Sequence, residues 1–191
     1  TIALEEVRIV ALTLWGAGRE SKESVELAMK HKPHAICGQG TSTDIGPYYL
    51  GSNDIYPDRA GMKDDLELLI KAAKENGVLF VFSMGGAGTD AQLDWALKII
   101  DEITKESDLS LRVAVISGEI SKEYLKSKLA AGVRMKRVVD TPRLAEYLTM
   151  EEVSRSEHIV AQMGPEPIME ALSLDADGVV TGRALDVGLS M

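Results

Sequence analysis

Several residue types that mark common protein classes are scarce in this chain of 191 residues. With one cysteine, Cys37, the chain has no second thiol for an internal disulfide and no cysteine pairs for a structural zinc site. Lys and Arg number 21 against 30 Asp and Glu, and this net charge of −9 disfavours a nucleic-acid backbone as partner. No apolar run approaches the roughly 20 residues of a transmembrane helix. These absences predict a soluble, cytoplasmic protein that binds neither nucleic acid nor membrane.

What the sequence does contain is an alternation of short apolar runs with longer helical patterns. Expected helices include residues 63–77, where Leu66, Leu69, Ile70 and Ala73 repeat at helical spacing, and 91–103. Further helices are expected at 21–30, at 121–131, from Thr141–Pro142, and after the Thr149–Glu152 capping box, the last carrying Val153 and His158. Expected strands, continuous in apolar character as if buried on both faces, are 7–13, 34–40, 78–84, 111–117 and 178–182.

Such an order predicts one α/β domain over residues 1–191. We expect a doubly wound, Rossmann-like, mostly parallel sheet of about five or more strands, with helices on both faces. Ligands of this architecture bind at the carboxyl ends of the strands, so the loops that follow the strands are the place to search for a site.

Glycine occurs in all five of these loops, which read LWGAGRES, GQGTSTDIGPYYLGSNDIYPDR, SMGGAGTD, SGEIS and GRALDVG. Glycines that make turns explain any one loop. Five together favour backbone amides and helix N-termini gathered around an anionic ligand. The second loop has no helical period over about 20 residues, and its tyrosines argue against disorder, so we expect an ordered lid or wall of the site.

Charged residues in the loops have two interpretations each. Asp44 is compatible with a general base, an acceptor for a substrate hydroxyl, or an Asx turn. Arg59 is either a clamp for a carboxylate or phosphate, or an ion-pair partner of Asp58 or Asp64. Glu119 either reaches the site or favours the dipole of the following helix. None of the three histidines is predicted to be catalytic, His158 being assigned to helix packing or the surface.

The third loop raises the question of a nucleotide site. Gly86-x-Gly88-x-x-Ala91 fits the looser dinucleotide fingerprint, but that motif expects an acid roughly 20 residues further on, at the end of the next strand. Glu119 lies 31 residues beyond Gly88, and the Gly-Lys-Ser/Thr ending of a P-loop is missing. A nucleotide-dependent enzyme is therefore disfavoured.

Four blocks, GTSTDIGPYYLGS, SMGGAGTD, MGPEPIMEAL and DADGVVTGRALD, resemble the acyclic terpene utilisation AtuA-like family along essentially the whole chain. Members of that family are longer, which implies that these residues are the N-terminal part of a longer protein or of a two-chain assembly. Leu185 departs from the family, which has a small residue there. The resemblance implies a set of site residues: Asp44, Gly46, Tyr49, Gly85, Gly86, Gly88, Glu166, Gly182, Arg183 and Asp186.

The resemblance implies a catabolic enzyme that acts on a small carboxylic acid or an acyl-CoA, and we expect a lyase or hydratase. Such chemistry needs a base and cationic or amide donors for the developing enolate. We expect Asp44 or Glu119 as the base, Arg59 and Arg183 as clamps, and the amides of residues 85–88 as donors. Arg183 has an alternative role as the ion-pair partner of Asp186.

No cofactor or metal site is predicted, although CoA would enter as part of a thioester substrate. A divalent metal held by loop carboxylates is disfavoured because they do not form a spacing motif. The alternative function is a non-catalytic subunit or ligand-binding module of a larger complex. A homo-oligomer, or association with a C-terminal part or partner chain, is expected as well.

Overall fold

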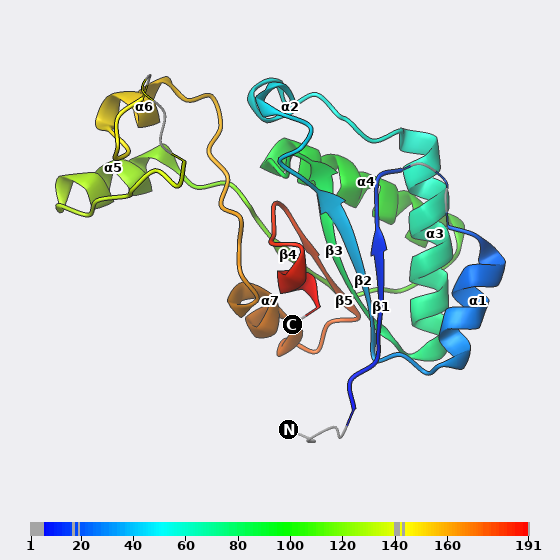
Figure 1. The fold of residues 1–191 in the computed structure, drawn as a ribbon. Coiled ribbons are helices and arrows are strands. Elements are labelled where there is room, and N and C mark those ends of the chain that lie inside the picture. The colour runs from blue at the N-terminus through cyan, green and yellow to red at the C-terminus, as the bar shows by residue number, and fades with distance from the viewer. Residues whose placement is uncertain (1–5, 17, 19, 140–141, 143, 191) are drawn as a thin grey trace.

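A five-stranded parallel sheet forms the centre of the computed structural model, which describes residues 6–16, 18, 20–139, 142 and 144–190 (Figure 1). The strands are β1 (Ile9–Thr13), β2 (Ala35–Thr41), β3 (Leu79–Gly86), β4 (Val113–Ile116) and β5 (Gly178–Thr181). Their spatial order is β1-β2-β3-β5-β4, and all four neighbouring pairs are parallel. This confirms the predicted α/β, Rossmann-like fold.

Helices cover both faces of the sheet, as expected. The chain moves across the sheet in one direction from β1 to β4 and then turns back to insert β5. Because crossovers between parallel strands are right-handed, a reversal of direction moves the connection to the other face. The helices α1 (Lys22–Lys30), α3 (Arg59–Asn76) and α4 (Asp90–Glu106) accordingly lie on one face, whereas α7 (Glu166–Leu172) and the 3-10 turn η1 (Val187–Leu189) lie on the other.

The central strand β3 supplies both cores, because alternate side chains of a strand point to opposite faces. Phe80 and Phe82 stack with ring centroids 5.0 Å apart in the larger core, where Leu66 of α3 and Ile99 of α4 are also fully buried. Val81 belongs to the smaller core under α7 and η1. The continuous apolar character of the sequence at 78–84 follows from burial on both sides.

One helix prediction near residue 150 is wrong, and a second is confirmed only in part. The helix α6 (Met150–Arg155) has the predicted capping box at Thr149 but ends before His158. Beyond it the chain is extended and pairs with the segment after β4, with Ile120 N donating to Ile159 O at 2.8 Å. Thr141 lies outside the described residues, but 144–148 are not helical, so no helix runs through that segment.

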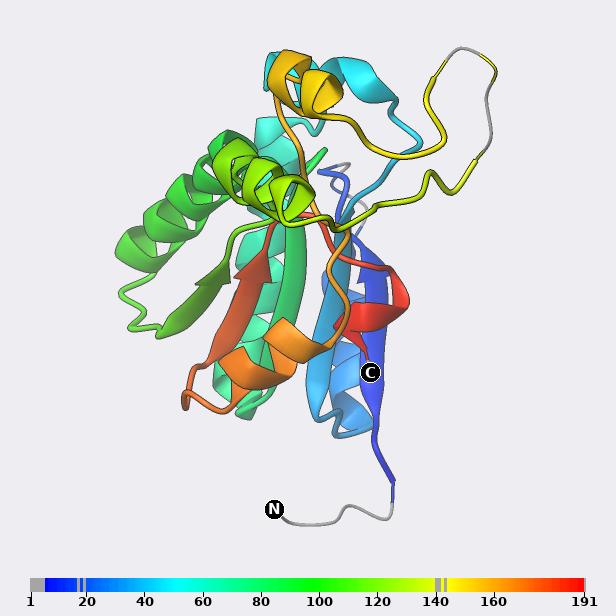
Figure 2. The same ribbon diagram turned by 90° about the vertical axis from the view of Figure 1, so that its left-hand side faces the viewer.

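Between β4 and α7 the chain leaves the body of the sheet and builds a separate lobe. This lobe contains α5 (Lys122–Ala130) and α6, which pack on each other, and an extended arm that connects them (Figure 2). A further short helix, α2 (Pro47–Ser52), lies within the long loop after β2. Among the described residues, none of the helices combines the length and the apolar character that spanning a membrane would require.

Candidate functional site

Glycines bring the ends of β3, β5 and β4 into backbone contact. Gly88 has φ +78°, and a Cβ there would overlap the backbone nitrogen of Arg183. A Cβ at Gly118 would lie 2.6 Å from the same nitrogen, and one at Gly182 would lie 2.7 Å from the nitrogen of Gly118. These three glycines therefore have a packing role that explains their presence, and this close packing brings the loops after the three strands together.

Gly85 and Gly86, the first two glycines of the third loop, also lie close to residues of other elements. At Gly85, φ is +95° and a Cβ would lie 2.6 Å from the Cβ of Gln92 on α4. Gly86 has φ +77°, and its carbonyl accepts a hydrogen bond from Ser42 N at 2.9 Å. Positive φ and close contact both require glycine here, so the loop shape follows from the sequence SMGGAG.

Arg183 is the most buried charge of the site, with 6% of its surface exposed. Its Nε donates to Ala87 O at 2.9 Å and its Nη2 to Ser42 O at 3.0 Å, so the guanidinium connects the loops after β2, β3 and β5. Among the described residues no carboxylate lies within 4.0 Å of it, and burial lowers the pKa of the guanidinium. A buried cation held only by carbonyl dipoles favours binding of an anion.

Asp186 does not form the ion pair with Arg183 that its spacing suggested. Its Oδ1 instead accepts a hydrogen bond from Gln39 Nε2 at 2.9 Å, near the end of β2. Gln39 in turn accepts from Ser83 Oγ at 3.1 Å, so the two residues belong to a polar chain across the strand ends. Arg183 is thereby left without an ion-pair partner in the part of the chain that the structure describes.

The segment after α6 supplies a residue that sequence reasoning missed. His158 Nδ1 lies 2.5 Å from Glu119 Oε1, and both side chains are about a quarter exposed. The other carboxylate oxygen accepts from the backbone N–H of Asp90, the first residue of α4, at 3.0 Å. The β-branched residues Ile159 and Val160, which favour extended structure, were the one local signal against a helix here.

The far side of the His158 ring contacts the long loop. Asn53, in the left-handed conformation with φ 60°, places its Nδ2 2.8 Å from His158 Nε2. An amide nitrogen only donates, so Nε2 accepts and the proton on Nδ1 is donated to Glu119. Among the described residues, Asn53 Oδ1 is buried without a hydrogen-bond partner.

A hollow of about 330 Å³ opens beside this pair. It lies where α4 and α5 begin, so the partial positive charge of two helix N-termini faces it. Ser117 Oγ donates to Asp90 Oδ1 at 2.5 Å on one side of the opening. The residues that line the hollow are Asp90, Glu119, Ile120, Ser121, Lys122, Glu157, His158 and Ile159.

Gln92, which is completely buried, holds the long loop against the rest of the site. Its Nε2 donates to the carbonyl oxygens of Tyr49 and Asp54, both at 2.9 Å, while its Oε1 accepts from Thr89 N at 3.2 Å. The ring of Tyr49 packs edge-on against that of Tyr56 at 5.2 Å. The long loop is therefore an ordered wall that Gln92 holds in place. The sequence pattern had identified Gln92 only as part of the expected helix 91–103.

Several predicted site residues lie apart from this network. Arg59 forms an ion pair with Glu102 of α4 on the helical face. Glu166, the first residue of α7, is exposed, and Gly46 precedes α2 with φ +80°. Asp44 is exposed, and its backbone N–H donates to Ser42 Oγ at 3.1 Å, so the turn here is made by the Ser42 side chain and not by the carboxylate of Asp44. Within the described ranges, no three His, Cys, Asp or Glu residues are grouped as a metal site would require.

Comparison with known proteins gives one match. The sequence model described as acyclic terpene utilisation family protein AtuA matches residues 52–191. Because the match begins at Ser52, the predicted residues Asp44, Gly46 and Tyr49 lie before it, whereas Glu119, His158 and Arg183 lie within it. No curated protein and no solved structure shows a significant match. Since the matched residues 52–191 make up well over half of this chain, the chain belongs to the acyclic terpene utilisation AtuA family.

Proposed function

We propose that this chain is an acid–base enzyme that adds or removes water next to the carboxyl group of a small carboxylic acid or its CoA thioester. The description of the family supports a role in the catabolism of acyclic terpenes. The observation that carries the proposal is the Glu119–His158 pair at the wall of a hollow where two helices begin. A carboxylate paired with an imidazole at the carboxyl edge of a parallel sheet is suited to moving a proton.

Glu119 is the base of the proposed reaction. An ionised carboxylate has about four acceptor positions, and His158 and Asp90 N occupy one on each oxygen. A free lone pair would take the proton from the carbon next to the carbonyl group, and the electrons of that C–H bond would form the double bond as the β-hydroxyl leaves. Returned to this hydroxyl, the same proton completes a molecule of water, and the enzyme regains its starting state.

Arg183 is the group that would hold the negative charge of the substrate. Gly118, the residue before Glu119, packs against the backbone of Arg183, and the guanidinium bonds to Ala87, three residues before Asp90. A carboxylate bound there would thus be near the base, and a cation aimed at a developing enolate stabilises it. The positive ends of α4 and α5 would act in the same direction.

Exchange of the α-proton in D2O, followed by NMR on a panel of short branched carboxylic acids and their CoA thioesters, tests the base separately from the later loss of water. We expect exchange with the wild type and a loss of roughly 100-fold or more with Glu119→Gln. His158→Gln should lower exchange as well, because the carboxylate loses its partner. Arg183→Met should weaken substrate binding, measured by calorimetry.

Glu157→Gln is the matched control, since Glu157 lines the same hollow and the substitution removes one carboxylate without touching the pair. Thermal melting of each variant separates loss of activity from loss of fold. Wild-type exchange rates in a folded Glu119→Gln protein would show that this carboxylate is not the base, and the proposal would then be abandoned.

A further inference from the structure

The lobe outside the sheet carries an arm with two exposed valines. We define the arm as residues 132–139 and 144–148, whose two sides are joined by Arg137 N donating to Glu146 O at 2.8 Å and Leu148 N to Met135 O at 2.9 Å. Near its tip Val138 is 98% exposed and Val139 73%. Figure 2 shows this arm reaching away from the sheet. These two valines supply apolar surface that a docked partner would cover.

The arm and the helix before it are also basic, in contrast to the rest of the protein. Residues 122–148 contain seven Lys or Arg and three Asp or Glu, a net charge of +4 in a chain of −9, so the other residues together carry −13. Arg134 and Lys136 are exposed on the arm, and the guanidinium of Arg134 lies 3.9 Å from the ring centroid of Tyr147. Because opposite charges steer association, a partner with an acidic surface is favoured.

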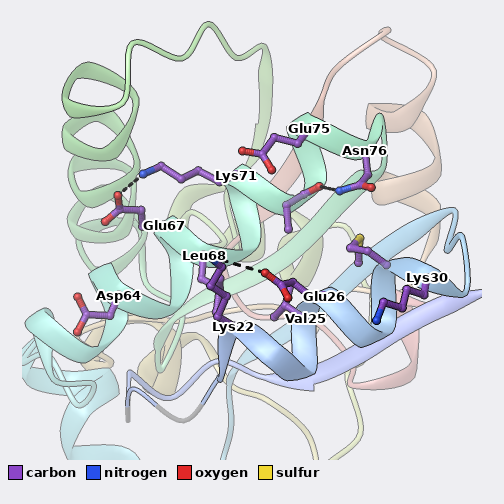
Figure 3. A pocket seen from close by; sticks show the side chains of 12 residues that line it. Lys22, Val25, Glu26, Lys30, Asp64, Glu67, Leu68, Lys71, Glu75 and Asn76 are labelled. Atoms are coloured by element: carbon purple, nitrogen blue, oxygen red, sulfur yellow. Dashed lines mark hydrogen bonds and ion pairs between the residues drawn. The ribbon is translucent and has the colours of Figure 1, made fainter.

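A groove on the opposite side of the same molecule has the complementary properties. It lies between α1 and α3 and has a volume of about 890 Å³ (Figure 3). Its walls include the apolar side chains Val25, Met29, Leu68 and Ala72, which could contact the valines of the arm. This groove is remote from the Glu119–His158 pair and so has no evident part in the acid–base site.

The charged rim of the groove leaves two carboxylates available. Lys22 pairs with Glu26 at 3.8 Å and Lys71 pairs with Glu67, each pair within one helix. Asp64 and Glu75, at either end of the stretch of α3 that lines the groove, form no ion pair with any described residue. Among the lysines that line the groove, Lys30 alone lacks an ion pair with a described residue. On the arm, Lys136 pairs with Glu146 at 3.5 Å in an exposed ion pair, whereas Arg134 forms no ion pair with any described residue. The acidic rim positions are therefore free to accept Arg134 of a docked arm, and Lys136 would exchange Glu146 for the rim.

We propose that the arm of one copy docks in the α1–α3 groove of a second copy, and reciprocally, to form a two-fold dimer. The α5–α6 lobe, which carries the arm, and the helices α1 and α3, which form the groove, lie on opposite sides of the molecule in Figure 1, so an arm does not reach its own groove. A reciprocal exchange closes with two copies, whereas a one-way contact would extend into a filament. This inference does not depend on the proposed reaction, since none of its residues belongs to the acid–base site.

Sedimentation velocity over a concentration series tests the dimer. The arm variant Arg134→Glu/Lys136→Glu and the groove variant Asp64→Lys/Glu75→Lys should each raise the dissociation constant at least about tenfold, because arm and groove then repel. Mixing the two variants should restore the dimer, since each reversed arm meets a reversed groove and each native arm meets a native groove. Val138→Asp/Val139→Asp should also weaken it.

Lys98→Glu/Lys105→Glu on α4 is the control for the arm variant, as it makes the same change in net charge away from both surfaces, and its dissociation constant should equal that of the wild type. Circular dichroism confirms that each variant is folded. A wild type that stays monomeric at every concentration would overturn the proposal. So would folded arm and groove variants that dimerise normally, or a mixture of the two that remains monomeric.

Discussion

Replacing Gln92 with glutamate tests whether one buried amide holds the long loop against the sheet. The substitution keeps the shape of the side chain but removes the N–H groups that donate to Tyr49 O and Asp54 O. Gln92 is buried and the two bonds are partly buried, so each carbonyl left without its donor costs about 1–2 kcal/mol, and we expect Gln92→Glu to lower the free energy of unfolding by about 3 kcal/mol. For a chain of this size that corresponds to a melting temperature lower by about 6–12 °C.

The loss should depend on pH in a defined direction. Burial opposite two carbonyl oxygens disfavours the charged form, so the pKa of the introduced carboxyl is raised in the folded state above its value in the unfolded chain, about 4.3. The deficit relative to wild type is therefore largest at neutral and higher pH. It shrinks as the pH falls toward the unfolded value, where the carboxyl is protonated in both states.

Urea unfolding at pH 7.5 and pH 5 measures this deficit, and limited proteolysis shows whether residues 42–58 become accessible. Gln162→Glu, at an exposed position, is the matched control and should unfold like the wild type. If Gln92→Glu equals the wild type in stability at pH 7.5, the hydrogen bonds to the loop do not stabilise it and the assignment of Gln92 as its anchor is wrong.

Three further predictions concern the strand ends and the core. Gly118→Ala should lower the melting temperature, measured by differential scanning fluorimetry, because its Cβ would lie 2.6 Å from a backbone nitrogen at the end of β5; an unchanged melting temperature would contradict the close packing. Asp177 accepts from Arg112 N at 2.7 Å and from Lys74 Nζ at 2.8 Å, which lower the pKa of its carboxyl. Asp177→Asn should therefore reduce stability by about 1 kcal/mol near neutral pH, and in urea unfolding the difference should disappear as the pH falls through that lowered pKa. Burial raises the pKa of the Cys37 thiol to about 11, so alkylation at pH 8 should be slow in the folded protein and fast in urea, and equal rates would show that the thiol is accessible.

Local patterns in the sequence were sufficient to predict most of the elements. The repeats in α3 and α4 and the apolar strands reflect which side chains are buried, and burial imposes its period on the sequence directly. Caps such as Thr89 and Gly77 act within one turn, so their positions also follow from neighbouring residues. The glycines after the strands marked the edge of the sheet where the loops gather for the same reason.

The composition of the candidate site was decided by contacts between distant segments. Glu119 and His158 are 39 residues apart and meet because the chain after α6 is extended and pairs with the chain after β4. Arg183 faces carbonyls instead of Asp186, and Arg59 pairs across two helices with Glu102, because strand order and helix packing set which charges are near one another. Short-range pattern in the sequence alone determined the elements and the edge where the loops gather. The tertiary structure, through the strand order β1-β2-β3-β5-β4 and the return of the chain from the α5–α6 lobe to the sheet, brought the imidazole, the carboxylate and the guanidinium around that edge.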